Sequence, residues 1–182
     1  AAFGNVCVLS KIKMDITATS IAQGGIAAVM YSPDNYKKHI KDTIIAGAGL
    51  NNENIVQIAI SESTERIREL VNWGTLFDKE STGKFSLAKE GGHSEHRILH
   101  HKDNTGNEIQ RVLSEKVRSH PNITVLENYL AIDLITQHHL GELIKRRDKG
   151  ITCYGAYALD KKNGNIITLL AKTTMLATGG LG

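Results

Sequence analysis

The pattern of apolar and polar positions predicts a chain that starts with a strand and then changes to helices. Residues 5–11, "NVCVLSK", are a short apolar run that ends at a basic residue, which predicts a buried strand. Residues 12–29 are small and polar, with Gly24-Gly25 among them. Such a composition favours backbone that lies close to another group, because glycine adds no side-chain bulk.

Three helices are predicted next. The first begins at Ser32-Pro33, since Ser32 can cap it and Pro33 fits the first helical position. The second covers about 52–73 and stops at Gly74, and the third starts near Gly106 and ends before Pro121. Apolar residues at helical spacing predict the inner faces of the second and third helices: Ile55, Ala59, Ile67, Leu70 and Val71, then Ile109, Val112, Leu113 and Val117.

The last third of the chain is predicted to be strands. Residues 123–135, 151–159 and 165–178 are rich in β-branched side chains, and Asn163-Gly164 predicts a type I′ hairpin between the last two. The order of elements predicts an α/β fold in which an antiparallel meander feeds back toward a main sheet.

Composition narrows the class of protein. Of 182 residues, 41% are hydrophobic and 23% charged, as in ordinary globular proteins, and a net charge of +3 is too weak to indicate nucleic acid. No apolar stretch reaches the roughly 18 to 20 residues of a membrane span. Cys7 and Cys153 lie far apart in apolar surroundings, which predicts buried thiols and a cytoplasmic protein. The chain starts without methionine and stops in a glycine turn, so we expect a partial chain.

Two glycine motifs are candidate ligand contacts. In "AQGGIAAV" (22–29), four backbone units carry only one bulky polar side chain, so their N–H groups can approach a flat ligand or a phosphate. Tight packing against another backbone explains that motif equally well. "ATGG" (177–180) follows an apolar run and predicts a sharp turn with exposed N–H groups, which many proteins have without a ligand.

Five of the eight histidines fall between His93 and His101. His93, His96 and His100 have helical spacing for a metal site, but Gly91-Gly92 argues against a helix there and no zinc signature fits. The predicted metal-ligand set is therefore none, and a metal-binding module remains an alternative. The other interpretations are a polar surface loop, or a substrate loop in which Glu90 supplies an anion.

The order of these motifs points to a family. "LSK", "AQGGIAAV", "DTIIAGAGLN", "EGGHSEHRILHHKDNTGNEI" and "ATGG" together resemble the L-aspartate oxidase family of flavoproteins, whose relatives are the flavoprotein subunits of fumarate reductase and succinate dehydrogenase. The likeness runs along essentially the whole chain. Succinate dehydrogenase types carry a histidine, bonded covalently to the flavin, five residues before the Gln of AQGG. Ala18 stands there, so the resemblance implies non-covalent FAD.

The resemblance also implies site residues. The FAD contacts would be Lys11 near the adenosine, a segment along the flavin, the end of the first meander strand on the adenine side, and the final glycine turn near the pyrophosphate or ribityl chain. These positions are Lys11, Ala18, Thr19, Ser20, Ile21, Ala22, Gln23, Gly24, Gly25, Leu130, Ala131, Thr178, Gly179 and Gly180. Glu90 would orient the amino group of the substrate, on a loop shared with Gly91, Gly92, His93 and Ser94.

The implied reaction is oxidation of L-aspartate to iminoaspartate, with hydride transfer to the flavin and reoxidation by oxygen or fumarate. Iminoaspartate would pass to quinolinate synthase in NAD biosynthesis. A fumarate reductase or succinate dehydrogenase type of flavoprotein is the alternative enzyme. The family's G-x-G-x-x-G segment and its capping and C-terminal helical domains are expected outside residues 1–182, which would form a partial FAD-binding, Rossmann-like domain. We expect the chain alone to hold FAD poorly and to be inactive.

Overall fold

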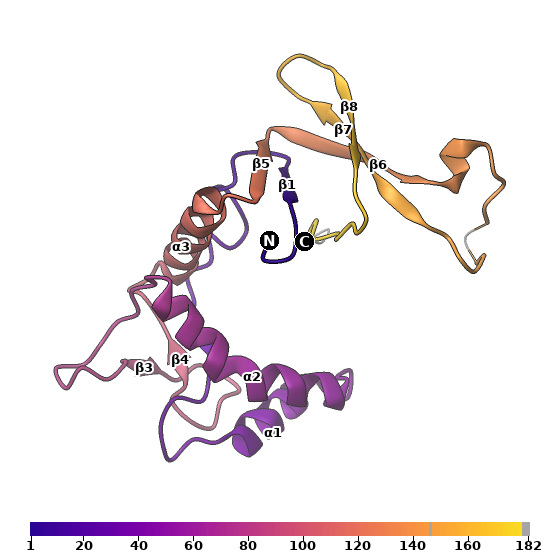
Figure 1. Ribbon diagram of the computed structural model, residues 1–182. Helices are drawn as coiled ribbons and strands as arrows, with labels where there is room; N and C mark the ends of the chain where they lie inside the picture. Colours follow the sequence, from indigo (N-terminus) through magenta and orange to yellow (C-terminus); the bar gives the residue numbers. More distant parts are fainter. Residues whose placement is uncertain (146, 180–182) are drawn as a thin grey trace. The chain divides into compact units, whose positions relative to one another are not determined.

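The computed structural model describes residues 1–145 and 147–179, and the chain divides into two compact units. One unit consists of residues 1–14 together with the chain from His120 onward, and the other is residues 15–119. Helices, one parallel strand pair and two antiparallel sheets are present (Figure 1), which confirms the predicted α/β class.

The first unit holds the parallel pair and the meander. Strand β1 (Val6–Ser10) pairs in parallel with β5 (Ile123–Glu127). Strands β6 (Tyr129–Thr136), β7 (Cys153–Asp160) and β8 (Ile166–Leu170) form an antiparallel sheet in that order, as predicted for a meander, and the 3-10 helix η1 (Gln137–Leu140) follows β6.

Three local predictions in this unit were wrong. Residues 123–135 are not one strand, because Asn128 with a φ of 64° separates β5 from β6. Asparagine tolerates this left-handed conformation, so the chain can turn there from one sheet into the other. The loop before β8 has a positive φ at Gly164 but not at Asn163, so the hairpin is real and its turn is not type I′. Strand β8 ends at Leu170, and 171–178 is irregular.

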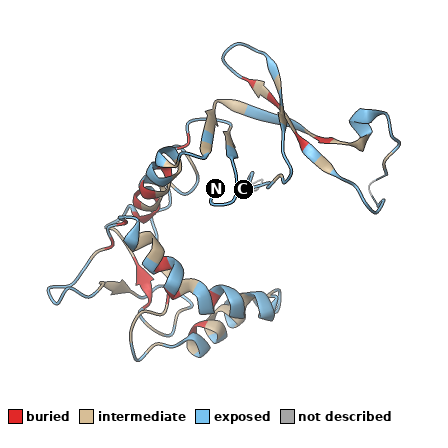
Figure 2. Ribbon diagram, viewed as in Figure 1, coloured by how far each residue is buried: buried red, intermediate tan, exposed pale blue. Residues whose placement is uncertain are grey.

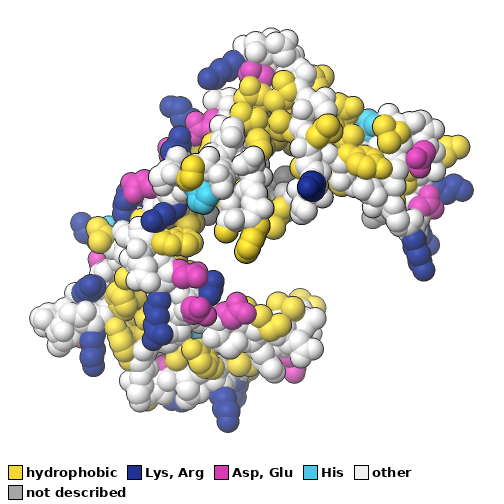
Figure 3. Space-filling model, in the orientation of Figure 1, with side chains coloured by type: hydrophobic (Ala, Val, Ile, Leu, Met, Phe, Trp, Pro, Cys, Tyr) yellow, Lys and Arg dark blue, Asp and Glu magenta, His cyan; other side chains and the backbone are white. Residues whose placement is uncertain are grey.

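The predicted burial of this unit was also wrong. Cys7 in β1 is exposed and Cys153 is half-buried, because β1 and β5 form a sheet of two strands among the described residues. Apolar side chains also gather over the meander strands in the space-filling view (Figure 3), and several are exposed: Leu130, Ile132, Tyr154, Ile166 and Leu170.

The second unit contains the helices. Helices α1 (Tyr36–Ala46), α2 (Glu53–Asn72) and α3 (Thr105–Ser119) accompany a small antiparallel sheet. Its strands β2 (Ile26–Ala27), β3 (Leu87–Ala88) and β4 (Ile98–Leu99) lie in the order β2-β4-β3. The sequence analysis missed this sheet, since strands of two residues carry no readable alternation.

Side-chain caps fix where the helices begin. Asn35 accepts a hydrogen bond from the backbone N–H of Lys38 at 3.0 Å, so α1 starts at Tyr36 and the predicted start at Ser32-Pro33 was wrong. Asn52 caps α2 in the same way. The predicted stop of α2 is confirmed, because Gly74 adopts a φ of 107° directly after the helix.

The core of this unit lies between the small sheet and the helices. Ala28, Ile67, Phe77 and Leu99 form its buried cluster, and Figure 2 shows buried positions on β4, α2 and α3. Of the predicted inner positions on α2, Ile67 is buried while Ile55 and Ala59 are exposed, since the buried face is Ile60, Thr64 and Ile67. The predicted inner face of α3 is confirmed: Val112 is buried and Ile109, Leu113 and Val117 are half-buried.

Candidate functional site

Residues 18–25, which we call the glycine strip, form an exposed stretch of backbone in the second unit. All but Ser20 are exposed, and Ser20 is half-buried. A turn shapes the start of the strip: the Ser20 hydroxyl donates to the Thr17 carbonyl at 2.8 Å, and the N–H of Ala22 donates to the Thr19 carbonyl at 3.1 Å. Within the described residues, no hydrogen bond uses the backbone N–H of Gln23 or Gly24.

Close packing holds the strip from below. The N–H of Gly106, in the first turn of α3, donates to the Ala22 carbonyl at 3.1 Å, and a Cβ on Gly106 would lie 1.9 Å from the Thr19 oxygen. A Cβ on Gly25 would lie 2.4 Å from the Leu99 oxygen. Gly25 therefore fits the packing interpretation of the AQGG motif, whereas Gly24 faces more open space.

The EGGHS loop, residues 90–94, lies beside this strip. Glu90, Gly91, Gly92 and Ser94 are exposed and His93 is half-buried. Gly92 has a φ of 82°, and the His93 N–H donates to the Glu90 carbonyl at 3.2 Å, so the glycine pair makes a tight turn. A Cβ on Gly24 would lie 3.8 Å from Oε1 of Glu90. The structure thus brings the carboxylate predicted for substrate next to a residue predicted for flavin.

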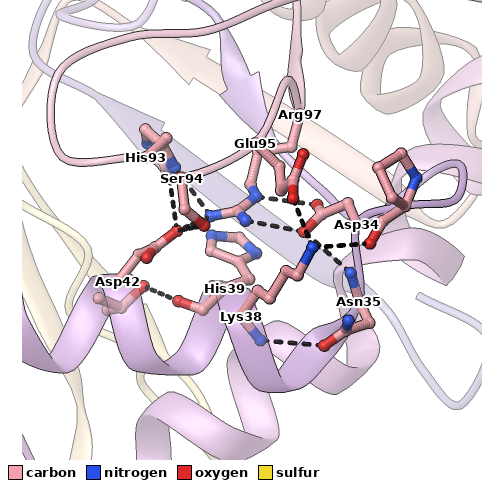
Figure 4. A network of polar contacts seen from close by, with 11 residues as sticks. Asp34, Asn35, Lys38, His39, Asp42, His93, Ser94, Glu95 and Arg97 are labelled. Atoms are coloured by element: carbon pink, nitrogen blue, oxygen red, sulfur yellow. Dashed lines mark hydrogen bonds and ion pairs between the residues drawn. The ribbon is translucent and has the colours of Figure 1, made fainter.

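A buried arginine anchors the end of the loop to α1. Arg97 is fully buried, and its Nε and Nη2 donate to the two oxygens of Asp34 at 2.9 and 2.7 Å. Its Nη1 donates to Asp42 at 2.6 Å and lies 3.2 Å from Nδ1 of His93 (Figure 4). We call Arg97, Asp34, Asp42 and His93 the Arg97 cluster. The sequence analysis assigned no role to Arg97.

Asp42 ties the EGGHS loop to the helix a second time. Its Oδ2 accepts hydrogen bonds from the backbone N–H of Ser94 at 2.8 Å and from the Ser94 hydroxyl at 2.7 Å. Burial alone would raise the pKa of Asp42, but the bonds from Ser94 and Arg97 outweigh it and lower the pKa to about 2. Lys38 of α1 also pairs with Glu95, next to the loop.

The charges in this region keep a neighbouring histidine neutral. His39 of α1 is buried, and its ring centroid lies 5.8 Å from that of His93. Burial lowers the pKa of His39, and the charges of Arg97 and His93 lower it further. Burial would lower the pKa of Arg97 as well, but its bonds to Asp34 and Asp42 raise it, so the guanidinium stays charged.

The histidines after the loop serve local structure. Nδ1 of His100 lies 3.1 Å from Asp78, and Nδ1 of His101 donates to the Leu76 carbonyl. Among residues 1–145 and 147–179, no three His, Cys, Asp or Glu side chains are arranged to hold a metal ion. In the same residues, no helix is long and apolar enough to cross a membrane.

Some of the predicted cofactor residues lie in the first unit. Lys11 follows β1 and is exposed, and its carbonyl accepts a hydrogen bond from the Lys161 ammonium at 3.1 Å. Leu130 and Ala131 are exposed and pair with β7. They stand at the start of β6, the first meander strand, so the prediction that they lie at its end was wrong.

The final glycine turn is only partly described. Thr178 and Gly179 are exposed, and Gly179 has a φ of 75°, as expected for a turn. The turn follows irregular chain and not the predicted strand. Gly180 lies outside the described residues.

A comparison with protein families decides what these features belong to. The family model of the FAD-binding domain matches residues 1–182, the whole chain. The chain belongs to the FAD-binding domain family. Among curated relatives of this FAD-binding domain, L-aspartate oxidase 1 of Ralstonia nicotianae is 42% identical over 97% of this chain and 32% of its own length. The chloroplastic L-aspartate oxidase 2-a of Nicotiana tabacum is 41% identical over all of this chain and 27% of its own length. The chain thus spans about a third of the length of these relatives.

Solved structures agree on the fold of this FAD-binding domain. A flavoprotein subunit variant, FrdA, of Escherichia coli quinol fumarate reductase matches with a TM-score of 0.87 at 23% identity, over 97% of this chain and 28% of that one. The Sdh1 complex of Mycobacterium smegmatis matches with a TM-score of 0.83 at 31% identity, over 98% of this chain and 30% of that one. The fold of the fumarate reductase and succinate dehydrogenase flavoproteins is therefore confirmed.

The residues of the second unit fit FAD. The glycine strip offers exposed backbone with little side-chain bulk, and N–H groups at Gln23 and Gly24 that no described residue uses. A flat ring system with polar edges needs this combination of close approach and hydrogen-bond donors.

Proposed function

We propose that this chain is the FAD-binding part of an L-aspartate oxidase, which oxidises L-aspartate to iminoaspartate. The observation that carries the proposal is the position of Glu90, whose carboxylate lies beside Gly24 of the glycine strip. The chain is also 42% identical to an L-aspartate oxidase over almost its whole length. The remaining FAD-binding segment and the capping and helical domains would come from the rest of a longer protein.

The glycine strip would hold the flavin, and FAD would supply the acceptor for the two electrons that leave the substrate. Ala18 has only a methyl side chain, so it offers no atom for a covalent link, and we propose that FAD is bound non-covalently. In the first unit, Lys11, Leu130, Ala131 and the turn at Thr178 would contact the rest of the cofactor.

Glu90 would orient the substrate through its amino group. A carboxylate only accepts hydrogen bonds and an ammonium only donates them, so the two form a charge-assisted pair. Once FAD and substrate cover the carboxylate, a dicarboxylate without an amine would leave it unpaired, which is costly in a dry site. Glu90 would therefore select aspartate over succinate.

The partners of the reaction follow from its chemistry. Oxygen or fumarate would reoxidise the cofactor, and quinolinate synthase would consume iminoaspartate in NAD biosynthesis. We propose a cytoplasmic enzyme, although the relatives from plants are named as chloroplastic.

A fumarate reductase or succinate dehydrogenase type of flavoprotein is the second candidate, because the fold is shared with both. The replacement Glu90→Gln separates the two functions. In the full-length protein with FAD, we expect kcat/KM for L-aspartate to fall at least about tenfold, since a charged hydrogen bond contributes about 1.5 to 3 kcal/mol.

The measurement is flavin reduction by L-aspartate and, separately, fumarate reduction or succinate oxidation by both variants. Lys89→Gln, an exposed neighbour on the same segment, is the matched control. If Glu90→Gln leaves the aspartate reaction unchanged, or if the unmodified protein turns over only succinate and fumarate, the proposal is wrong.

A further inference from the structure

The contact between Arg97 and His93 fixes which nitrogen of the His93 ring carries the proton. Nη1 of Arg97 lies 3.2 Å from Nδ1 of His93. A guanidinium has N–H donors and no acceptor, and Arg97 stays charged because two buried carboxylates surround it. Nδ1 of His93 must therefore accept. The proton of a neutral imidazole ring then sits on Nε2.

Arg97 itself has no freedom to turn away. Its side chain is fully buried, and the two carboxyl groups that hold it have side chains only 3% and 13% exposed, Asp34 and Asp42 respectively. Three of its nitrogens, Nε, Nη1 and Nη2, donate to these carboxylates at 2.6 to 2.9 Å. The same Asp42 binds the backbone N–H and the hydroxyl of Ser94. Both the ring of His93 and the residue after it are thus fixed to α1.

We propose that Arg97 is a positioning residue, which holds His93 as its Nε2–H tautomer and makes it a hydrogen-bond donor on the loop that carries Glu90. The loop then presents an acceptor at Glu90 and a neutral donor at His93, three residues apart. A substrate with both an amino group and a carboxylate needs this pair. Only the naming of a substrate carboxylate as the acceptor for Nε2–H rests on the proposed function.

The groups that face His93 favour this role. Arg97 lies at Nδ1, the buried ring of His39 packs at 5.8 Å, and Asp42 is already engaged by Arg97 and Ser94. Of the two ring nitrogens, Nε2 is thus the one left to act on a ligand. A lysine in place of Arg97 could not do the same, because one ammonium cannot bind both carboxylates and the ring in this planar arrangement.

The tautomer can be measured without any substrate. Nitrogen-15 NMR of histidine-labelled, full-length protein with FAD should show His93 with an unprotonated Nδ1 and a protonated Nε2, the signal being assigned by its loss in His93→Gln. Arg97→Lys should give a mixture of tautomers. Lys38→Met, which breaks the Lys38–Glu95 pair beside the loop and leaves Arg97 intact, is the control and should keep the single tautomer.

The donor role has its own readout. In His93→Gln the amide N–H₂ can replace Nε2–H, whereas His93→Phe has no donor. We expect KM for L-aspartate to rise about tenfold in His93→Phe with a smaller change in kcat, and to stay within about threefold in His93→Gln.

The outcomes separate the claims. A protonated Nδ1 or a tautomer mixture in the unmodified protein would overturn the positioning role, whatever the reaction. A single Nε2–H tautomer without any flavin reduction by aspartate would sink the proposed function and leave the positioning role standing. Aspartate oxidation with an unchanged KM in His93→Phe would overturn the donor role.

Discussion

The replacement Gly106→Ala tests whether the glycine strip contacts FAD, because it pushes on the strip without touching the ligand side. Gly106 lies in the first turn of α3, under the strip. A methyl group there would meet the Thr19 oxygen at 1.9 Å and the Cβ of Ala22 at 2.8 Å. Atoms of folded proteins essentially never approach a Cβ within 3.0 Å, so the backbone of the strip must move.

The size of the effect follows from this geometry. The strip and α3 must separate by about 1 Å, and overpacking of this kind costs about 1 to 3 kcal/mol. The hydrogen bond from the Gly106 N–H to the Ala22 carbonyl would also lengthen from 3.1 Å, with a net cost of about 1 kcal/mol. Without FAD the strip can relax outward. If FAD requires the native position, most of this strain appears as lost affinity, about 10-fold to 100-fold in Kd.

The assay is FAD titration of the full-length apoprotein, followed by flavin fluorescence, together with urea unfolding of the same samples. Asn107→Ala is the matched control, since Asn107 is the next residue of α3 and is exposed. A Gly106→Ala protein that is destabilised but binds FAD with unchanged Kd would refute a contact between the strip and FAD. No change in either measurement would refute the close approach itself.

Two further predictions concern stability. The folded pKa of Asp42 is about 2 against 3.8 unfolded, so its ionised form stabilises the fold by about 2 kcal/mol above pH 4, and this contribution should disappear as pH falls toward 2. Urea unfolding between pH 3 and pH 6 should therefore show a flatter pH dependence for Asp42→Asn, and equal slopes would contradict the assignment. Gly155→Ala would place a Cβ 1.9 Å from the Leu169 oxygen at a φ of 143° and should destabilise the meander by several times the roughly 1 kcal/mol expected for Gly164→Ala, which meets no atom within 4 Å. Comparable melting temperatures for the two glycine variants would refute this.

The helices were the most predictable part of the fold, because they are long enough for the sequence to repeat its pattern. Helix α3 has 15 residues, and its apolar positions return to one face several times before Pro121. The stop of α2 at Gly74 was equally readable, since a left-handed residue after a helix is usually glycine. The start of α1 was misread because Ser32-Pro33 and Asn35 are both acceptable starts, and only the bond from Lys38 to Asn35 decides between them.

The strands were less predictable, because their boundaries depend on partners elsewhere in the chain. Residues 123–135 contain no break in β propensity, yet β5 pairs with β1 and β6 pairs with β7. The short strands β2, β3 and β4 exist only because they pair with one another. Burial of Cys7 was predicted for a strand with neighbours on both sides, which β1 lacks among the described residues.

The candidate site was half readable from the sequence. Glu90 and the glycine strip were found through motif order, and the structure places Glu90 beside Gly24. Arg97 was missed for a physical reason. Its carboxylate partners are 63 residues away at Asp34 and 55 residues away at Asp42, so no local spacing reveals that the guanidinium is buried between them.

That buried arginine explains how a loop with two adjacent glycines can still present a fixed carboxylate. Glycines lose the most conformational freedom on ordering, so the EGGHS loop is expensive to hold in one shape. Breaking a buried ion pair typically costs 3 to 5 kcal/mol, because it leaves an uncompensated charge inside the protein, and Arg97 makes two such pairs. The loop therefore keeps the turn that Gly92 requires without losing its attachment to α1. The histidine-rich segment suggested a metal cation, and the cation that neutralises its neighbouring carboxylates is the guanidinium of Arg97.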